Sequence, residues 1–203
     1  MEGETGSTDF PTTPGSFQPA FAGGDADGFV AKLRPNGRRL VWSTFVGGSG
    51  FDGAHDGELD KAGNFYLDGP TGSADFPVTG GAFQAGYGGG PTDAFLILLS
   101  RDGSRLEFGS YLGGSGEDGS AGAGSWLDGR GNYYIPGFTD STDFPVTPGV
   151  YQATNVGGFD VFLVKVALGK RHKGSGQRTA SVTAAGRSGD RAGLSRDRMG
   201  GTR

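Results

Sequence analysis

The amino-acid sequence predicts an all-β chain built from repeated antiparallel units. A twelve-residue segment occurs three times, as STDFPTTPGSFQ at residues 7–18, SADFPVTGGAFQ at 73–84 and STDFPVTPGVYQ at 141–152. The three copies start 66 and then 68 residues apart. Glycine makes up 43 of the 203 residues without a triplet period, which excludes a collagen-like helix and suits many tight turns between short strands.

The first hairpin is expected between residues 27 and 48. Phe29, Ala31 and Leu33 alternate with Val30 and Lys32, which is the period-2 pattern of a β-strand. Asn36-Gly37 follows and favours a type I′ turn, because that turn needs two positive φ values. Residues 40–46 are rich in β-branched and aromatic side chains and predict the returning strand.

The same hairpin returns at residues 93–114, with Asp102-Gly103 at the turn. In this copy the four residues from Leu96 to Leu99 are all apolar, so that both faces of the strand are apolar. We therefore expect this strand to be covered on both sides by neighbouring sheets.

A second hairpin is expected after each GGSG loop. Residues 58–60 lead through a three-residue turn ending in Gly63 into NFYLDG, and residues 126–128 lead through a turn ending in Gly131 into NYYIPG. A three-residue turn with glycine in the last position predicts a type I turn closed by a glycine bulge.

Two hairpins give four strands per repeat, and four antiparallel strands at a fixed period are typical of a β-propeller blade. The sequence thus predicts a partial β-propeller of about two four-stranded antiparallel blades built from ~66-residue repeats. Closed propellers have roughly four to eight blades, so this chain is expected to be a fragment of a longer repeat protein. The expected parts are an incoming repeat loop at 1–26, propeller-type repeats at 27–168 (a partial blade at 27–48, a full blade at 56–114 and an incomplete blade at 122–168) and a tail at 169–203.

The last blade is expected to lack its fourth strand. Residues 160–166 have the pattern of its third strand, and the sequence then passes directly into a basic segment. An unprotected sheet edge at 160–166, prone to pairing with other chains, is therefore predicted.

Charge divides the chain at residue 168. Residues 1–168 carry 9 Lys+Arg and 20 Asp+Glu, whereas residues 169–203 carry 9 Lys+Arg and 2 Asp. All 23 aromatic residues precede residue 169, so the last segment buries too little apolar surface to offset its ordering entropy, and a basic disordered tail is expected. A solvated tail or a misread reading frame is favoured over nucleic-acid binding, because the basic residues have neither aromatic neighbours nor a regular spacing.

Several classes of protein are excluded by what the sequence lacks. It contains no cysteine, so disulfides and thiolate metal sites are ruled out. It has no run of ~18 apolar residues, so no membrane span is expected. The first residues, MEGETGSTDFP, lack the basic and apolar regions of a signal peptide.

Residues that recur in every repeat are expected to serve the fold, because an active site is usually assembled once. The aspartate of the DFP motif is expected to bind backbone amides. The proline keeps the preceding phenylalanine extended, so that its ring can plug the blade. The glutamine that closes the motif is expected to clip a loop to the backbone. These residues are Asp9, Asp75 and Asp143, then Phe10, Phe76 and Phe144, then Gln18, Gln84 and Gln152.

Two acidic groups suggest calcium, namely Asp25 with Asp27 and Asp52 with Asp56, since hard cations prefer several oxygen ligands. Neither group has EF-hand spacing, and aspartates in glycine-rich turns usually bind local amides. No metal ligand and no cofactor-binding residue is therefore assigned.

His55 belongs to the one polar cluster that does not recur. A lone histidine offers no paired ligand for zinc, and the sequence has no GxSxG motif, so no catalytic residue is assigned. Trp42 and Trp126 are expected to pack in the core or between blades rather than to form a sugar-binding platform.

These motifs, in this order, resemble the bacterial SBBP (seven-bladed β-propeller) repeat. The matching strings are DAF at 93–95, SYLGGSG at 110–116, GNYY at 131–134 and STDFP at 141–145, and the resemblance covers roughly residues 7–166. It implies an extracellular or cell-surface protein in which such blades act as scaffolds, often beside adhesion-type domains. The family pattern has an apolar strand where Gly57-Glu58-Leu59 stands here.

Three functions remain open at this point. The first is a non-catalytic scaffold or interaction domain, whose partners are further propeller blades, another protein chain or a surface polysaccharide. The alternative is a fragment of a carbohydrate-active propeller enzyme or a sugar-binding protein, which calls for carboxylates on the innermost strands, whereas the aspartates here cluster in turns. The third is a fragment without an independent role. The repeat and the lack of a unique polar constellation favour the first.

Overall fold

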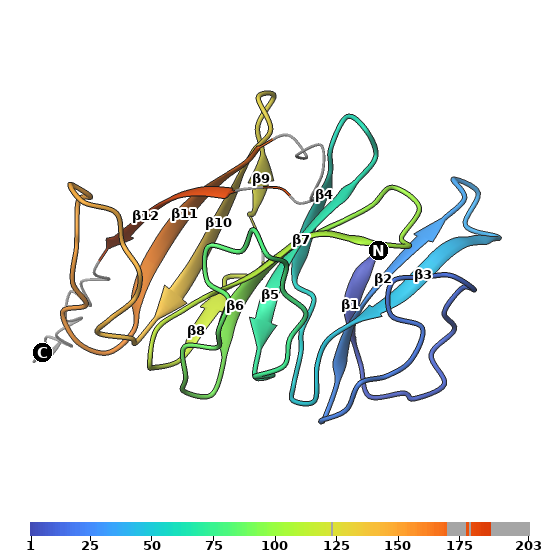
Figure 1. The fold of residues 1–203 in the computed structure, drawn as a ribbon, viewed down its shortest axis with the longest axis horizontal. Coiled ribbons are helices and arrows are strands. Elements are labelled where there is room, and N and C mark those ends of the chain that lie inside the picture. The colour runs from blue at the N-terminus through green and yellow to red at the C-terminus, as the bar shows by residue number, and fades with distance from the viewer. Residues whose placement is uncertain (123, 170–177, 179, 188–203) are drawn as a thin grey trace, which may run out of the picture.

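The computed structural model describes residues 1–122, 124–169, 178 and 180–187, which form twelve strands in three antiparallel sheets and no helix (Figure 1). The N-terminal sheet has the order β1 (Glu2–Thr5), β2 (Asp27–Leu33), β3 (Leu40–Val46). The middle sheet has the order β4 (Asp56–Leu59), β5 (Phe65–Thr71), β6 (Asp93–Leu99), β7 (Leu106–Leu112). The C-terminal sheet has the order β12 (Ala180–Arg187), β11 (Asp160–Leu168), β10 (Asn132–Thr139), β8 (Asp118–Ser120), with β9 (Trp126–Leu127) paired to β10.

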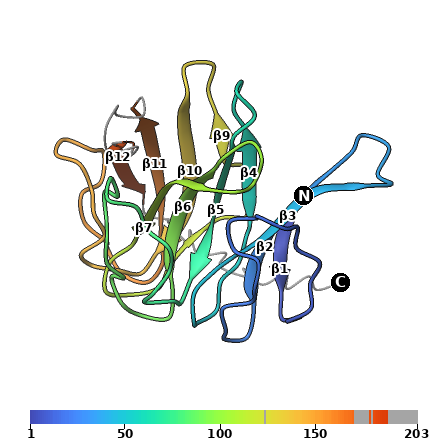
Figure 2. The same cartoon turned by 45° about the vertical axis from the view of Figure 1, so that its right-hand side comes forward.

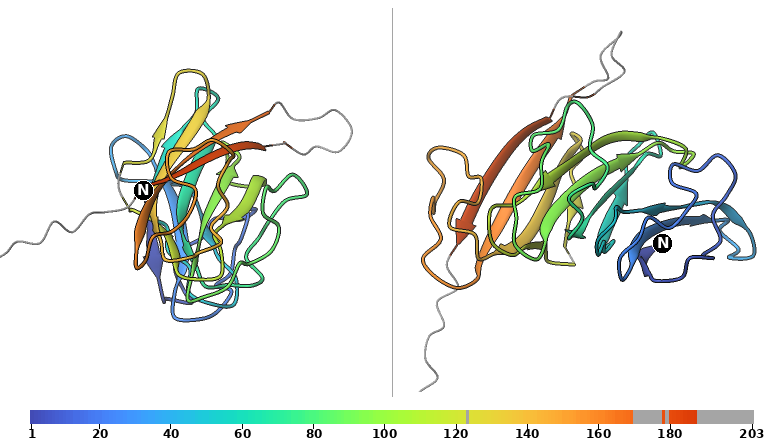
Figure 3. Two further views of the ribbon diagram at one scale, coloured as in Figure 1. Left: turned by 90° about the vertical axis from the view of Figure 1, so that its left-hand side faces the viewer. Right: turned by 60° about the horizontal axis from the view of Figure 1, so that its bottom comes forward.

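The three sheets stand beside one another in chain order, with the N-terminal sheet at the right of Figure 1 and the C-terminal sheet at the left. Figure 2 and the right panel of Figure 3 show the same succession from other directions. In the left panel of Figure 3, the sheets overlap because the view runs along the row. We call the face that a sheet turns toward the next sheet in the chain its front face, and the opposite face its rear face. In the C-terminal sheet, the rear face is the one that packs on the middle sheet, and the front face is the opposite one.

Strand β6 is buried along its whole length, as expected from its continuous apolar run. Ala94, Leu96 and Leu98 belong to the apolar core shared with the C-terminal sheet. Phe95, Ile97 and Leu99 belong to the core shared with the N-terminal sheet. Because side chains alternate between the faces of a strand, one strand supplies both cores. The prediction of a strand covered on both sides is confirmed.

Polar contacts between sheets accompany the apolar ones. The indole Nε1 of Trp42 in the N-terminal sheet donates to the carbonyl of Arg101 at 3.1 Å, and the Phe17 amide donates to the carbonyl of Gly103 at 2.8 Å. Both acceptors lie in the β6–β7 turn of the middle sheet. On the other side, the rings of Tyr66 and Tyr133 stack at 5.1 Å between the middle and C-terminal sheets.

Four turns that connect adjacent strands share one design. In each, the amide of a glycine donates to the carbonyl three residues earlier, and the glycine has a φ between 68° and 87°. The acceptor and glycine pairs are Arg34 and Gly37, Asp60 and Gly63, Ser100 and Gly103, and Asp128 and Gly131. A positive φ is cheap only for glycine. The prediction of a two-residue type I′ turn at Asn36-Gly37 is therefore wrong, because Pro35 fixes a negative φ and the turn starts one residue earlier.

The fourth strand that the last repeat was expected to lack is present as β12. It pairs with β11 over eight registers, from Val161 with Arg187 to Leu168 with Ala180. The prediction of an unpaired edge at 160–166 is therefore wrong. The backbone groups of the β11 edge are paired with those of β12, a pairing that needs no particular side chains. The prediction of a disordered tail over 169–203 is likewise wrong for residues 180–187, which form β12. Residues 170–177, 179 and 188–203, to which the same prediction applies, lie outside the described part of the chain.

The prediction that residues 1–26 form a loop is wrong for the first few residues. Glu2–Thr5 form β1, which pairs with β2 in the same register in which β5 pairs with β6, since Thr5 faces Asp27 and Thr71 faces Asp93. The N-terminal sheet thus has three strands rather than the two expected from residues 27–48. The middle sheet has the four strands expected between residues 56 and 114.

Replacement of Leu96 by alanine tests the double burial of β6. Leu96 is fully buried and lies in the core between the middle and C-terminal sheets, so Leu96→Ala should lower the free energy of unfolding by about 2–5 kcal/mol. Leu59→Ala is the matched control, because Leu59 lies in the same sheet but is 54% exposed, and it should cost less than about 1 kcal/mol. If urea denaturation shows that the two variants lose equal amounts of unfolding free energy, the assignment of Leu96 to the core is contradicted.

Candidate functional site

The DFP motif ties each repeat to the loop of the preceding one. Oδ1 of Asp75 accepts from the Ser49 amide at 2.8 Å, and Oδ1 of Asp143 accepts from the Ser115 amide at the same distance. Asp9, in the first copy, is exposed. These two hydrogen bonds hold the pKa of Asp75 and of Asp143 below its usual range. The expectation that these aspartates bind backbone amides is confirmed for the second and third copies.

The phenylalanine of the same motif packs on a phenylalanine of the sheet in all three copies. The ring centroids are 4.5 Å apart for Phe10 and Phe29 and for Phe76 and Phe95, and 4.6 Å apart for Phe144 and Phe162. The predicted plugging role is confirmed, and the ring adds apolar burial at the rear face of each sheet.

The glutamine that ends the motif links two loops to a buried carboxylate. Nε2 of Gln84 donates to Oδ2 of Asp93 at 3.1 Å, and Oε1 of Gln84 accepts from the Gly113 amide at 3.0 Å. Gln18 makes the same two contacts with Asp27 and the Gly47 amide. The predicted role as a clip is confirmed, and its target includes a carboxylate that sequence reasoning did not connect to it.

The structure brings together two pairs of buried aspartates, one per inter-repeat loop. Asp27 lies near Asp52 and Asp93 lies near Asp118, and all four side chains are fully buried. A Cβ added to Gly47 would lie 2.7 Å from both Asp27 Oδ1 and Asp52 Oδ2, so these two oxygens are at most twice that distance apart. Gly113 occupies the same place between Asp93 and Asp118. A side chain at either glycine would collide with both carboxylates.

Hydrogen bonds satisfy only half of the oxygens of these carboxylates. Oδ2 of Asp52 accepts from the Gly48 amide and the Ser73 hydroxyl, each at 2.7 Å. Oδ2 of Asp118 accepts in the same way from Gly114 and Ser141. Each Oδ1 atom of the four aspartates has no hydrogen-bond partner in the described part of the chain, and no Lys, Arg or His of that part forms an ion pair with them.

Burial without a cation favours the protonated form of these groups. Burial, with a smaller contribution from the neighbouring carboxylate, raises the pKa of Asp27 to about 6 and the pKa of Asp93 to about 7. Burial also raises the pKa of Asp52 and of Asp118. Each pair is therefore suited to share one proton near neutral pH.

The acidic groups that suggested calcium are rearranged by the fold. Asp27 and Asp52 are neighbours, whereas Asp25 is exposed and Asp56 instead accepts from the Ser125 amide at 2.9 Å. Within the described ranges, no group of three or more His, Cys, Asp or Glu is placed to hold a metal ion.

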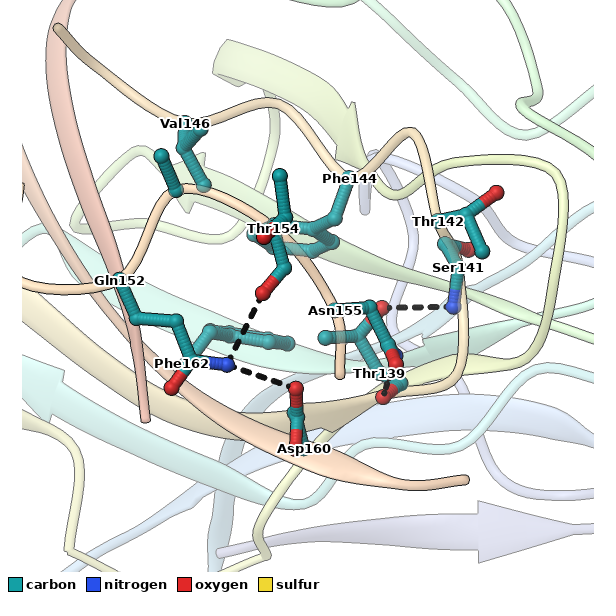
Figure 4. A pocket seen from close by; sticks show the side chains of 11 residues that line it. Thr139, Ser141, Thr142, Phe144, Val146, Gln152, Thr154, Asn155, Asp160 and Phe162 are labelled. Carbon is teal, nitrogen blue, oxygen red and sulfur yellow. Dashed lines mark hydrogen bonds between the residues drawn. The ribbon is translucent and has the colours of Figure 1, made fainter. Parts of the chain in front are cut away.

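The third repeat has a small cavity where the first two have aromatic side chains (Figure 4). Phe21 packs on Phe45 and Tyr87 packs on Tyr111, each with ring centroids 5.9 Å apart. Asn155 takes the corresponding place in the third repeat and donates to the carbonyl of Gly158 at 3.1 Å. The cavity is about 20 Å³, which is room for roughly one water molecule.

The non-recurring cluster His55-Asp56-Gly57-Glu58 has no fully buried member, and the buried carboxylate nearest to it along β5 is Asp68. His55 is exposed, and a Cβ added to Gly53 would lie 3.2 Å from its Nε2 and 2.9 Å from Glu4 Oε2. Asp68 is fully buried and accepts from the Tyr133 hydroxyl at 2.7 Å. Burial raises the pKa of Asp68 to about 6. This arrangement ties the middle sheet to the C-terminal sheet rather than presenting a carboxylate to solvent.

The two tryptophans differ in environment. Trp42 is 6% exposed and packs in the core between the N-terminal and middle sheets, as expected. Trp126 is 54% exposed and stacks on Tyr134 with ring centroids 5.2 Å apart. Of the two expected environments, packing in a core is therefore wrong for Trp126, since β9 is a two-residue strand at the sheet margin, and packing between blades stays a prediction.

A cleft lies between the middle and C-terminal sheets. Its volume is about 430 Å³, and its walls include Phe83, Leu112 and Val146. Its charged side chain, Asp143, already accepts from Ser115, and its glutamine, Gln84, already binds Asp93. The cleft is thus apolar, with its main polar groups engaged in the fold.

The front face of the C-terminal sheet leaves apolar side chains in solvent. Val161 and Leu163 of β11 are about half exposed, and Tyr151 in the preceding loop is 88% exposed. Phe159 and Val156 are also more than half exposed. This open apolar face is the feature of the described surface that most resembles a protein-binding site.

No protein-family model matches the chain, and no curated protein matches it. None of the described residues forms a helix long and apolar enough to cross a membrane.

The paired carboxylates predict an unusual dependence of stability on pH. Because the folded pKa values of Asp27 and Asp93 exceed the ordinary value of 3.8, the native state binds more protons than the unfolded state between about pH 4 and pH 7. The free energy of unfolding should therefore fall as pH rises through this window, by on the order of 1 kcal/mol or more. Urea denaturation at about pH 5 and about pH 8 measures the difference.

Substitution of both Asp27 and Asp93 tests whether these carboxylates cause the fall in unfolding free energy with pH. The double variant Asp27→Asn with Asp93→Asn should lose less unfolding free energy between these two pH values than the wild type. The loss that remains comes from Asp68, Asp52 and Asp118, whose pKa values burial also raises. Asp128→Asn is the control, because hydrogen bonds from Asn132 lower the pKa of Asp128 to about 2, so it titrates outside the window. A wild-type chain that is equally or more stable at the higher pH would contradict the assignment.

Proposed function

We propose that the chain is a β-propeller-type repeat module that acts as a non-catalytic extracellular scaffold or interaction domain. The observation that carries this proposal is that the same residue positions build both interfaces between sheets. Phe17 and Phe83, the same position of the twelve-residue segment, pack against the first and the second inter-sheet core. Val30 of β2 and Leu96 of β6 likewise occupy equivalent positions in the two cores.

The arrangement of strands supports the assignment of blades. The middle sheet is an antiparallel meander in which β4, β5, β6 and β7 follow one another in space as in sequence. The C-terminal sheet repeats this order, with β9 and β8 both pairing with β10 at the place of the first strand, followed by β10, β11 and β12. A blade of four antiparallel strands has this arrangement, and the resemblance of residues 7–166 to the SBBP repeat favours an extracellular location.

The buried carboxylates favour a scaffold over a hydrolase. A glycosidase needs two carboxylates that reach a substrate, separated by roughly 5–9.5 Å. The paired aspartates here have no accessible surface, and Asp68 is bonded to Tyr133 across two sheets. These groups hold loops and sheets together.

Duplication of one whole repeat tests whether the chain is modular. A second copy of residues 73–140, inserted in register between Asp140 and Ser141, should add one four-stranded sheet. Because stability in repeat proteins grows with the number of interfaces, the longer chain should unfold in one transition with a higher free energy and a steeper dependence on urea. A duplication of residues 73–112 alone is the control, since it cuts the unit after β7 and should not stabilise the chain. Equal behaviour of both insertions would overturn the modular assignment.

Polysaccharide binding is a second candidate function, favoured by the stacked pair of the exposed Trp126 and the half-buried Tyr134. Stacked aromatic rings offer the flat apolar surface on which sugar rings pack, and Nζ of Lys165 lies 5.8 Å from the Tyr134 ring centroid. If this surface binds glycans, Trp126→Ala should abolish binding on a glycan array. Tyr151→Ala, which removes a more exposed ring elsewhere, should leave it unchanged. Release of reducing sugars by the purified chain would contradict the non-catalytic proposal.

A further inference from the structure

We propose that the chain associates head to tail with a second copy of itself, the front face of one C-terminal sheet docking on the rear face of the other N-terminal sheet. This inference names the partner of the proposed scaffold and rests on its repeated interfaces. The chain already forms such an interface twice, between its first and second sheets and between its second and third.

The front face of the C-terminal sheet has the residue positions that are packed in the preceding sheet. Strand β11 follows β6 at the same place in the repeat, so Val161 corresponds to Ala94 and Leu163 to Leu96. Ala94 and Leu96 are fully buried beneath the C-terminal sheet, whereas Val161 and Leu163 are 50% and 51% exposed. The same face is thus covered in one sheet and open in the next.

The recurring aromatic residue of the twelve-residue segment shows the same contrast. Phe17 packs into the core in front of the N-terminal sheet, and Phe83 packs into the core in front of the middle sheet, 6.0 Å from the ring of Phe108. Tyr151 is the third member of this series and is 88% exposed. In its own repeat, Tyr151 occupies the position at which Phe17 and Phe83 contact the next sheet.

The rear face of the N-terminal sheet carries the complementary positions without a sheet against them, while Phe10 packs on Phe29 as Phe76 packs on Phe95. Phe29 and Leu33 correspond to Phe95 and Leu99, both of which are fully buried against the N-terminal sheet. Leu33 is 40% exposed and Phe29 is only partly buried. A sheet presenting Leu163 and Tyr151 would cover these residues as the N-terminal sheet covers the middle one.

A second copy satisfies both open faces at once. The two faces differ, so the contact is heterologous and either closes into a ring or continues as a filament. Each copy contributes three sheets, and two copies together fall within the range of roughly four to eight blades at which propellers close. Lys165 lies on this front face, where its apolar stem can stay against Tyr134, and Asp160, the other charged residue of β11, is buried.

Complementation between two surface variants of the full chain tests the proposal. Leu163→Arg blocks the front face and Leu33→Arg blocks the rear face, and each variant alone should be monomeric by size-exclusion chromatography with light scattering. An equimolar mixture should recover a 1:1 dimer, because one intact front face and one intact rear face remain. Leu59→Arg is the matched control, since Leu59 is an exposed leucine of the middle sheet, and it should leave the association unchanged.

Several outcomes would overturn the proposal. A wild-type chain that stays monomeric up to its solubility limit would do so, as would a mixture that remains monomeric while the wild type associates. Association that survives Leu163→Arg would also do so, because it would show that another surface, such as the β12 edge, makes the contact. Circular dichroism of each variant verifies that it is folded. The two proposals can fail separately. If the duplicated repeat stabilises the chain while the wild type stays monomeric, the proposal of self-association is wrong and the proposal of a modular scaffold is retained.

Discussion

The burial of β6 on both faces is the constraint on which the rest of the structure depends. A seven-residue strand with six consecutive apolar residues has no face left for solvent, so it requires a sheet on each side. The chain meets this requirement by repeating the same unit before and after it. Each inter-sheet core then uses alternate residues of one strand, and the spacing of the repeats follows from the length of four short strands with their turns.

This stacking explains the buried polar residues. The loops that lead from one sheet to the next must pass close to the sheet margin, where their backbone amides lose water. Asp52 and Asp118 accept from the amides of Gly48 and Gly114, and Asp75 and Asp143 accept from the serines that follow. The same residue types recur because the same loop is rebuilt in each repeat. The cost is a close pair of carboxylates at each loop, which is relieved when one of them holds a proton.

Much of this architecture could be predicted from the sequence, because its main signals are local. The apolar run at Leu96–Leu99 indicated a doubly covered strand, and Gly63 and Gly131 indicated the turns that are observed. Strand β1 was missed because its residues, EGET, carry no apolar pattern; the signal that could have found it is the match of Gly3, Thr5 and Gly6 to Gly69, Thr71 and Gly72. Strand β12 was missed for a different reason. Its pairing with β11 uses backbone groups, which composition does not reveal, and Ala184 alone of its described side chains is buried in the core.

The buried carboxylate pairs were partly foreseen and partly missed. Asp27 and Asp52 were each marked as acidic loop residues, yet their proximity depends on how two loops meet over Gly47, which lies beyond local sequence. Trp126 was misjudged because large aromatic residues are usually buried, and only the position of β9 at the sheet margin places it in solvent. In both cases the position of the residue depends on how distant segments pack together, which the residue type does not reveal.

Hydrogen exchange of individual backbone amides tests the central claim most directly. If β6 is the strand on which both cores depend, its amides between Asp93 and Leu99 should exchange only through global unfolding and be the slowest in the chain. The amides of β1 and β12, at the margins of their sheets, should exchange much faster. Protection of β6 no greater than that of β12 would contradict the account.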